Sequence, residues 1–171
     1  MAKRTTQTTR MNGKRVRIVT TTGPTGTKVT VEAAPVLEWQ LQAEAVRQLK
    51  AMPEYASSAS MVAANDNSGR PSFAIAADMN GDYRSKRAAV IAKATGIAAG
   101  DPDLRLYGQN GSLLLIEFKN AEGRLSADQK ERHALLRALG YRIEVVKAAT
   151  EDDAARQAVD QVRSWLALTN L

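Results

Sequence analysis

Two acids and a lysine stand at the open end of a predicted β-hairpin near the middle of the chain. Residues 100–120 read GDPDLRLYGQNGSLLLIEFKN, in which two apolar runs flank an Asn-Gly turn. Asp103 opens the first run, and Glu117 and Lys119 close the second. Two carboxylates that converge at strand ends repel each other, so either one takes up a proton or a cation lies between them. These residue types indicate either an ion pair or an oxygen-rich cation site.

A cation site at this position would suit chemistry on phosphate esters. Mg²⁺ takes few carboxylates and keeps several waters. A metal there could lower the pKa of a bound water and stabilise the negative charge that develops on the phosphate in the transition state. Lys119 could orient the attacking water or neutralise the developing negative charge. The alternative is an exposed hairpin end with a weak surface ion pair, because Glu-x-Lys by itself is a very weak signal.

The strand register decides whether the two acids meet. Side chains alternate along a strand, so Glu117 and Lys119 share one face. A two-residue turn at Asn110–Gly111 would pair Asp103 with Phe118, on the wrong face. A loop with an odd number of residues, or one bulge, pairs Asp103 with Glu117 or Lys119 instead. We predict such a loop or bulge.

The elements expected around the hairpin predict an α/β fold, with a mixed β-sheet flanked by helices. From residue 35 the predicted order is helix, strand, helix, two strands, helix, strand and helix. The corresponding ranges are 35–52, 72–77, 84–96, 103–119, 126–140, 141–148 and 150–170. Residues 53–72 are small and polar and are expected to form a loop.

The N-terminal residues carry the net charge of the chain, which is +6 over 171 residues. Residues 1–31 contain seven basic residues and no acid. We expect residues 1–13 to be disordered and residues 14–33 to form a β-hairpin. Such an arm suits a polyanion, above all nucleic acid, or is simply a solvated tail. The sequence therefore predicts two parts: a basic arm with a hairpin over 1–34, and a domain over 35–171.

The composition excludes several classes of protein. The chain is 44% hydrophobic, which is enough for one domain with a core, and it has no cysteine for disulfide or thiolate chemistry. No apolar run approaches the roughly 18 residues needed to cross a bilayer, and no secretory signal is recognisable, so we expect no membrane partner. Aromatic residues make up 5% of the chain, which argues against a stacking-based single-strand binder. Trp39 and Trp165 are expected in the core.

Three motifs in order form an uncommon combination. They are Gly100-x-Pro102-Asp103-Leu104, Ile116-Glu117-Phe118-Lys119 and Gly123-Arg124-Leu125-Ser126-x-x-Gln129, followed by Leu136, Gly140-Tyr141 and Val145-Val146. This string resembles the VRR-NUC family of the PD-(D/E)XK nuclease superfamily. The resemblance covers residues 36–150 and is most specific over 100–146. It implies a restriction-endonuclease-like mixed β-sheet flanked by helices, here with an N-terminal β-hairpin extension.

The resemblance implies a Mg²⁺-dependent DNA endonuclease, with Mn²⁺ as an alternative metal. Asp103 and Glu117 would be metal ligands, together with the main-chain carbonyl of Phe118. Lys119 would serve the nucleophilic water, and Gln129 would be the family's helix glutamine near the site.

The family also uses an acid from the first helix. Glu38 is the best match and would be a further metal ligand, while Glu44 is the competitor on a different helix face. Asp101 departs from the family pattern, since an apolar residue usually stands there, and it would be solvated or would alter metal affinity. His133 follows Gln129 by four residues, hence on the same helix face, and we leave it outside the catalytic set as a surface or packing residue.

Basic residues on the predicted helix 84–96 indicate a DNA-binding face, since no acid occurs between Tyr83 and Gly100. A solvated helix face is the alternative. The predicted phosphate contacts are Arg84, Lys86, Arg87, Lys93 and, after the hairpin, Arg124.

The family further implies a structure-selective enzyme that resembles Holliday-junction resolvases and acts as a homodimer on branched DNA. Two paired sites would suit symmetric cutting of a four-way junction. The alternatives are a flap or repair nuclease, and a DNA-binding module on a nuclease fold that does not cut. The expected location is the cytoplasm of a bacterial or phage-infected cell, at the nucleoid.

Overall fold

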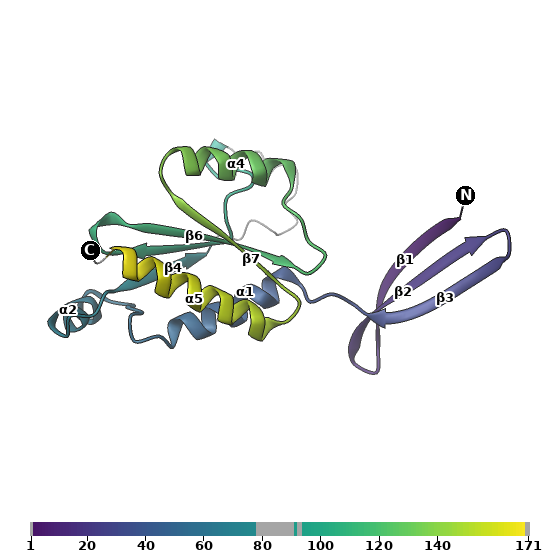
Figure 1. Cartoon of the computed structure of the whole chain (residues 1–171), viewed down its shortest axis with the longest axis horizontal. Helices are drawn as coiled ribbons and strands as arrows, with labels where there is room; N and C mark the ends of the chain where they lie inside the picture. Colours follow the sequence, from purple (N-terminus) through teal and green to yellow (C-terminus); the bar gives the residue numbers. More distant parts are fainter. Residues whose placement is uncertain (1, 78–90, 92–93, 170–171) are drawn as a thin grey trace. The chain divides into compact units, whose positions relative to one another are not determined.

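The computed structural model of the chain describes residues 2–77, 91 and 94–169. The chain divides into two compact units, Met1–Val36 and Leu37–Leu171 (Figure 1). Most of the predicted helix over 84–96 lies outside the described residues, since only 91 and 94–96 are described. Its four basic residues, Arg84, Lys86, Arg87 and Lys93, all lie outside them.

The N-terminal unit is a three-stranded antiparallel sheet in the order β1-β2-β3. Its strands are Lys3–Met11, Lys14–Gly23 and Gly26–Ala33. The prediction that residues 1–13 are disordered was therefore wrong, and the extension has one strand more than a hairpin. Asn12 and Gly13 both have positive φ, 50° and 77°, and link paired Met11 and Lys14. This is the two-residue Asn-Gly turn that suits a hairpin, and the threonines that follow Lys3 favour a strand.

The C-terminal unit contains a four-stranded mixed sheet in the order β4-β5-β6-β7. Its strands are Phe73–Ala77, Leu104–Gly108, Leu113–Asn120 and Arg142–Ala148. β4–β5 and β5–β6 are antiparallel, whereas β6–β7 is parallel and joined through a helix. The predicted α/β class with a mixed sheet is confirmed.

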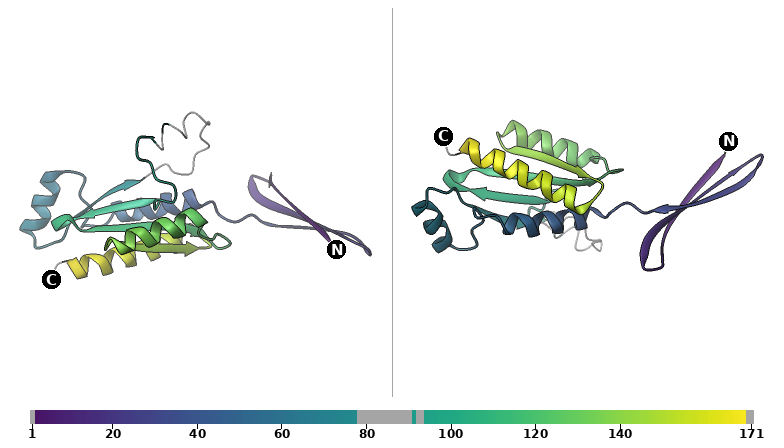
Figure 2. Two further views of the ribbon diagram at one scale, coloured as in Figure 1. Left: turned by 90° about the horizontal axis from the view of Figure 1, so that it is seen from above. Right: turned by 60° about the horizontal axis from the view of Figure 1, so that its bottom comes forward.

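Four helices flank this sheet within the described part of the unit: α1 (Glu38–Lys50), α2 (Ala59–Asn67), α4 (Ala127–Ala138) and α5 (Glu151–Thr169). α4 lies over one face, and α1 and α5 lie together over the other (Figures 1 and 2). Alternation along β6 divides the core accordingly, because Leu115 packs with Leu136 of α4, whereas Leu114, Ile116 and Phe118 are buried on the opposite face.

Three sequence expectations about this unit need correction. Residues 53–72 are not all loop, because α2 forms there with the Ser58 hydroxyl capping the Met61 N–H. The first helix begins at Glu38, three residues after Pro35. Trp39 is 64% exposed rather than in the core, because the buried stripe of α1 runs through Leu41, Ala45 and Leu49, whereas Trp165 is buried as expected. None of the helices in the described ranges is long and apolar enough to span a bilayer.

Candidate active site at the end of strands β5 and β6

The β5–β6 register brings Asp103 and Glu117 to the same end of the sheet. Leu104 pairs with Ile116, so continuing the ladder by one residue places Asp103 opposite Glu117. Tyr107 pairs with Leu113, which leaves the five residues 108–112 between the last paired positions. The predicted odd loop is therefore confirmed. It is closed by a hydrogen bond from the Gly108 N–H to the Ser112 carbonyl, 2.8 Å long.

Glu117 is the centre of the cluster and is completely buried. Its Oε1 lies 2.7 Å from Lys119 Nζ and accepts a hydrogen bond from Gln129 Nε2 at 2.5 Å. Its Oε2 has no hydrogen-bond partner among the described residues. A buried carboxylate with one oxygen satisfied and one left open is costly to maintain.

The surroundings of Glu117 oppose its ionisation. Burial raises the pKa of Glu117 to about 7, and the nearby Asp103 carboxyl adds to this increase, although the hydrogen bond with Lys119 acts against it. Burial also raises the pKa of Asp103, partly opposed by its backbone hydrogen bond. The two acids therefore form the electrostatically coupled pair that their spacing predicted.

Asp103 is held in place by hydrogen bonds to its side chain and to its main chain. Its Oδ2 accepts a hydrogen bond from the Phe118 N–H at 2.8 Å, and its carbonyl accepts one from Gln42 Nε2 at 3.2 Å. Phe118 itself has its side chain fully buried. The carboxyl of Asp103 is thus fixed beside the strand segment that carries Glu117.

Lys119 connects Glu117 to the first helix. Its Nζ lies 3.0 Å from Glu38 Oε2, and the side chain is only 8% exposed. Burial lowers the pKa of Lys119, but the hydrogen bonds to Glu117 and Glu38 outweigh it, and the pKa ends above its ordinary value. Lys119 is therefore a cation at neutral pH rather than a proton acceptor.

Glu38, and not Glu44, reaches this cluster. Its Oε1 accepts a hydrogen bond from the Asn120 N–H at 3.4 Å, in addition to the contact with Lys119. Glu44 instead binds Arg47 and Gln48 on its own helix. Gly123 makes room for Glu38, because a Cβ at this position would lie 2.6 Å from Glu38 Oε1.

The first turn of α4 places Gln129. The Ser126 hydroxyl accepts from the Gln129 N–H, while Gln129 Oε1 accepts from the Ser126 N–H, which forms a capping box. The amide oxygen is thereby occupied, and the amide nitrogen is left to donate to Glu117. Gly100 permits the close approach of this turn, since a Cβ there would lie 2.5 Å from the Asp128 carbonyl oxygen.

His133 is the residue that sequence reasoning undervalued. It is completely buried, and its Nε2 lies 3.6 Å from the open Oε2 of Glu117. Burial lowers the pKa of His133, with further lowering by Arg137 and Lys119, so the imidazole is neutral at neutral pH. The four-residue spacing from Gln129 was the available signal, since it places both side chains on one face of α4.

Two other sequence candidates lie outside the cluster. Asp101 is bridged by Arg105 at 2.6 Å and by Arg132 at 2.5 Å, so it is neither solvated nor directed at the two acids. This ion triad fastens the segment before β5 to α4. Arg124 is exposed in the segment between β6 and α4.

The described residues contain no group of three or more acidic, histidine or cysteine side chains arranged to hold a metal ion. Lys119 Nζ contacts both Glu38 and Glu117, at 3.0 Å and 2.7 Å, and after burial Asp103 is the acid that adds most to the raised pKa of Glu117. The donor types nevertheless fit a hard cation. Mg²⁺ commonly takes only one or two carboxylates, with water and substrate phosphate completing its shell, and the open Oε2 of Glu117 is an unused acceptor.

No family model, curated protein or solved structure matches this chain. The resemblance to the VRR-NUC family therefore stays a prediction that rests on the motifs themselves.

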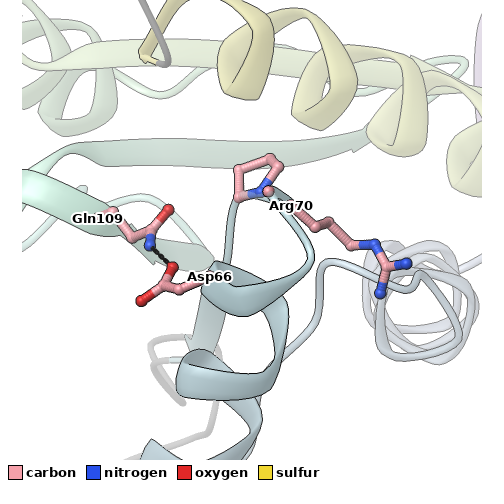
Figure 3. A pocket seen from close by; sticks show the side chains of 5 residues that line it. Asp66, Arg70 and Gln109 are labelled. Carbon is pink, nitrogen blue, oxygen red and sulfur yellow. Dashed lines mark hydrogen bonds between the residues drawn. The ribbon is translucent and has the colours of Figure 1, made fainter.

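A hollow elsewhere in the unit has a structural explanation. Asp66, Gly69, Arg70, Pro71 and Gln109 line it, between the end of α2 and the β5–β6 loop (Figure 3). Gln109 Nε2 donates to Asp66 Oδ1, which ties the loop to α2. Arg70 extends away from this pair in Figure 3. The residues that line the hollow thus connect α2 to the β5–β6 loop, and none of them is an acid of the candidate site.

Proposed function

We propose that the C-terminal unit is a metal-dependent DNA endonuclease with a restriction-endonuclease-like sheet, related to the VRR-NUC family. The observation that carries this proposal is the buried Glu117, which lies beside Asp103 with one oxygen open. An apolar residue in this position would stabilise the fold at least as well as an incompletely satisfied carboxylate. Perturbed acids next to a buried lysine are typical of functional sites.

Mg²⁺ is the metal that the donor types favour, with Mn²⁺ as the alternative. Asp103, Glu117 and the main-chain carbonyl of Phe118 would hold it, and Glu38 would be the further carboxylate. When bound, the metal would supply a water of lowered pKa and stabilise charge on the phosphate.

The chain's own residues would prepare this site. The Phe118 N–H orients Asp103, and Gln129 holds one oxygen of Glu117. Lys119 keeps its proton, so its role would be to position the attacking water and neutralise charge that develops on the phosphate. Glu38 restrains the Lys119 ammonium at 3.0 Å, which limits its freedom before DNA arrives.

We further propose that the enzyme acts as a homodimer on branched DNA. Two active sites related by a two-fold axis would suit symmetric cutting of a four-way junction. The support for this part is the motif resemblance alone, so substrate choice must be decided by assay.

The test is cleavage of a labelled panel that includes linear duplex, single strand, flap and four-way junction, each with Mg²⁺, Mn²⁺ or EDTA. Lys119→Ala should abolish cleavage and leave DNA binding largely intact. Lys147→Ala is the matched control, because Lys147 is exposed on β7 and pairs in register with Lys119. Cutting in EDTA, or undiminished cutting by Lys119→Ala, would contradict the proposal. Binding by the wild type without cutting under any metal would favour the non-cutting DNA-binding module.

A further inference from the structure

The N-terminal sheet has two faces of different character. The β1–β2 and β2–β3 ladders run without a bulge, so alternation assigns every side chain to one face or the other. One face, which we call the basic face, contains five of the seven cations of the sheet and its one acid. Its residues are Arg4, Thr6, Thr8, Arg10, Arg15, Arg17, Val19, Thr21, Lys28, Thr30 and Glu32.

The opposite face is aliphatic at its centre. Val16, Ile18, Val29 and Val31 lie there, and its charged residues, Lys3 and Lys14, stand at its ends. Both lysines are exposed, as are Arg4, Arg10 and Lys28 on the basic face. The cations are therefore sorted by face and not merely concentrated in the N-terminal residues.

The arrangement of the basic face leaves positive charge unneutralised. Arg10 lies directly opposite Arg15 in the ladder, and like charges in that position destabilise a strand pair. Arg15 is fixed by a hydrogen bond to the Pro35 carbonyl at 3.0 Å. Glu32 accepts from Arg17 at 3.1 Å and is the one acid on this face. An anion placed between Arg10 and Arg15 would relieve their repulsion.

The dimensions of the face match an extended polyanion rather than a single ion. Arg4 and Arg10 are six residues apart on β1, or about 20 Å at the ordinary strand rise. Arg4 and Lys28 are two strands apart, or about 10 Å. Duplex DNA carries one phosphate per ~1.7 Å of axis when both strands are counted, so a length of about 20 Å holds about a dozen, and those on one side of the duplex would meet the face. The threonines between the cations add hydroxyl donors for phosphate oxygens.

The absence of aromatic residues from the N-terminal unit indicates which form of nucleic acid the basic face would bind. Residues 1–36 contain no Phe, Tyr or Trp. Proteins that bind single-stranded nucleic acid stack its bases on aromatic side chains, and this sheet contains no aromatic side chain. We propose that the basic face binds the phosphate backbone of duplex DNA without reading its sequence. This inference concerns the N-terminal unit and does not depend on the proposed catalysis.

The experiment is fluorescence anisotropy of a labelled duplex with the full chain in EDTA, across a range of salt concentrations. In the counterion-release description, removing one cation that pairs with a phosphate weakens binding roughly eightfold at about 0.1 M salt and flattens the log–log salt slope by about 0.9. Arg4→Gln/Arg10→Gln should therefore weaken binding by about 60-fold and flatten the slope by about 1.8. Lys3→Gln/Lys14→Gln removes the same charge from the opposite face, with one residue on β1 and one on β2, and should change neither quantity.

Two further arms make the result decisive. Arg4→Lys/Arg10→Lys keeps the charge and should keep the wild-type slope, which guards against loss of the sheet fold. Equal losses in the two glutamine variants would overturn the assignment to a face, and unchanged binding in both would remove the sheet from the DNA interface. Stronger binding to phosphatidylserine vesicles than to duplex would assign the face to a membrane and overturn the proposal. Because the experiment measures binding and not cleavage, its result can be interpreted even if the protein proves not to be a nuclease.

Discussion

Replacing Glu117 by glutamine should change how the stability of the metal-free protein depends on pH. Burial raises the pKa of Glu117 from 4.5 to about 7. Between these values the unfolded chain has released the proton and the folded chain retains it. The folded state therefore binds more protons, so the wild type loses stability as pH rises through this window. Glutamine cannot ionise, so the Glu117→Gln variant does not lose stability in this way as pH rises.

The magnitude follows from the width of the window. One pKa unit corresponds to 1.36 kcal/mol, so a shift from 4.5 to about 7 is worth about 3 kcal/mol. The free energy of unfolding of Glu117→Gln, minus that of the wild type, should rise by about this amount between pH 4.5 and pH 7 and be constant above it. Lys119 retains Glu38 as a partner in the variant, which limits any offset from removal of the Glu117 carboxylate.

The assay is urea unfolding of both proteins in EDTA at several pH values. The difference between the two curves removes titrations that they share, including that of His133, whose lowered pKa weakens the fold as pH falls. The matched control is Glu44→Gln, an acid that is paired on the surface of α1. Parallel curves for Glu117→Gln and the wild type would refute the view that Glu117 is a desolvated acid.

Two further substitutions test how the site is supported. Gly123→Ala should lower cleavage about 10- to 100-fold, because the added Cβ would lie 2.6 Å from Glu38 Oε1 and would displace this carboxylate from Lys119. Steady-state kinetics would show a fall in kcat, and wild-type kinetics in this variant would contradict a role for the Glu38 position. Asp101→Asn should destabilise the fold by about 2 kcal/mol, measured by urea unfolding, because it breaks ion pairs with both Arg105 and Arg132. Its affinity for Mn²⁺, measured by calorimetry, should equal that of the wild type, and a clear loss would place Asp101 among the metal ligands.

The local geometry of the site could be predicted where it depends on strand alternation. Glu117 and Lys119 share a face because their spacing is two, and only an odd loop or a bulge could bring Asp103 to them. The role of Glu38 could not be worked out in this way, because it lies 81 residues from Lys119 and meets it only through packing of α1 beside β6. The motif resemblance selected Glu38 over Glu44, and spacing alone would not have done so.

The errors in the fold have particular causes. Residues 59–67 contain mainly Ala, Ser and Asn, so no apolar stripe indicates a helix. α2 is anchored by its Ser58 cap and by the buried Asn65–Ser72 hydrogen bond instead. The basic composition of the residues before Asn12-Gly13 favours disorder, although the dipeptide itself is a strong turn signal. Burial of His133 depends on how α4 meets β6, which helix periodicity does not specify.

The central claim is that the acids at the end of β5 and β6 serve metal-dependent cleavage of DNA. Its most direct test is single-turnover cleavage of a labelled four-way junction, and of the linear duplex, by wild type, Glu117→Gln and Glu44→Gln with Mg²⁺ and with EDTA. We predict cutting by the wild type and Glu44→Gln only when Mg²⁺ is present, and none by Glu117→Gln. Cutting by Glu117→Gln at the wild-type rate, or cutting by the wild type in EDTA, would contradict the claim.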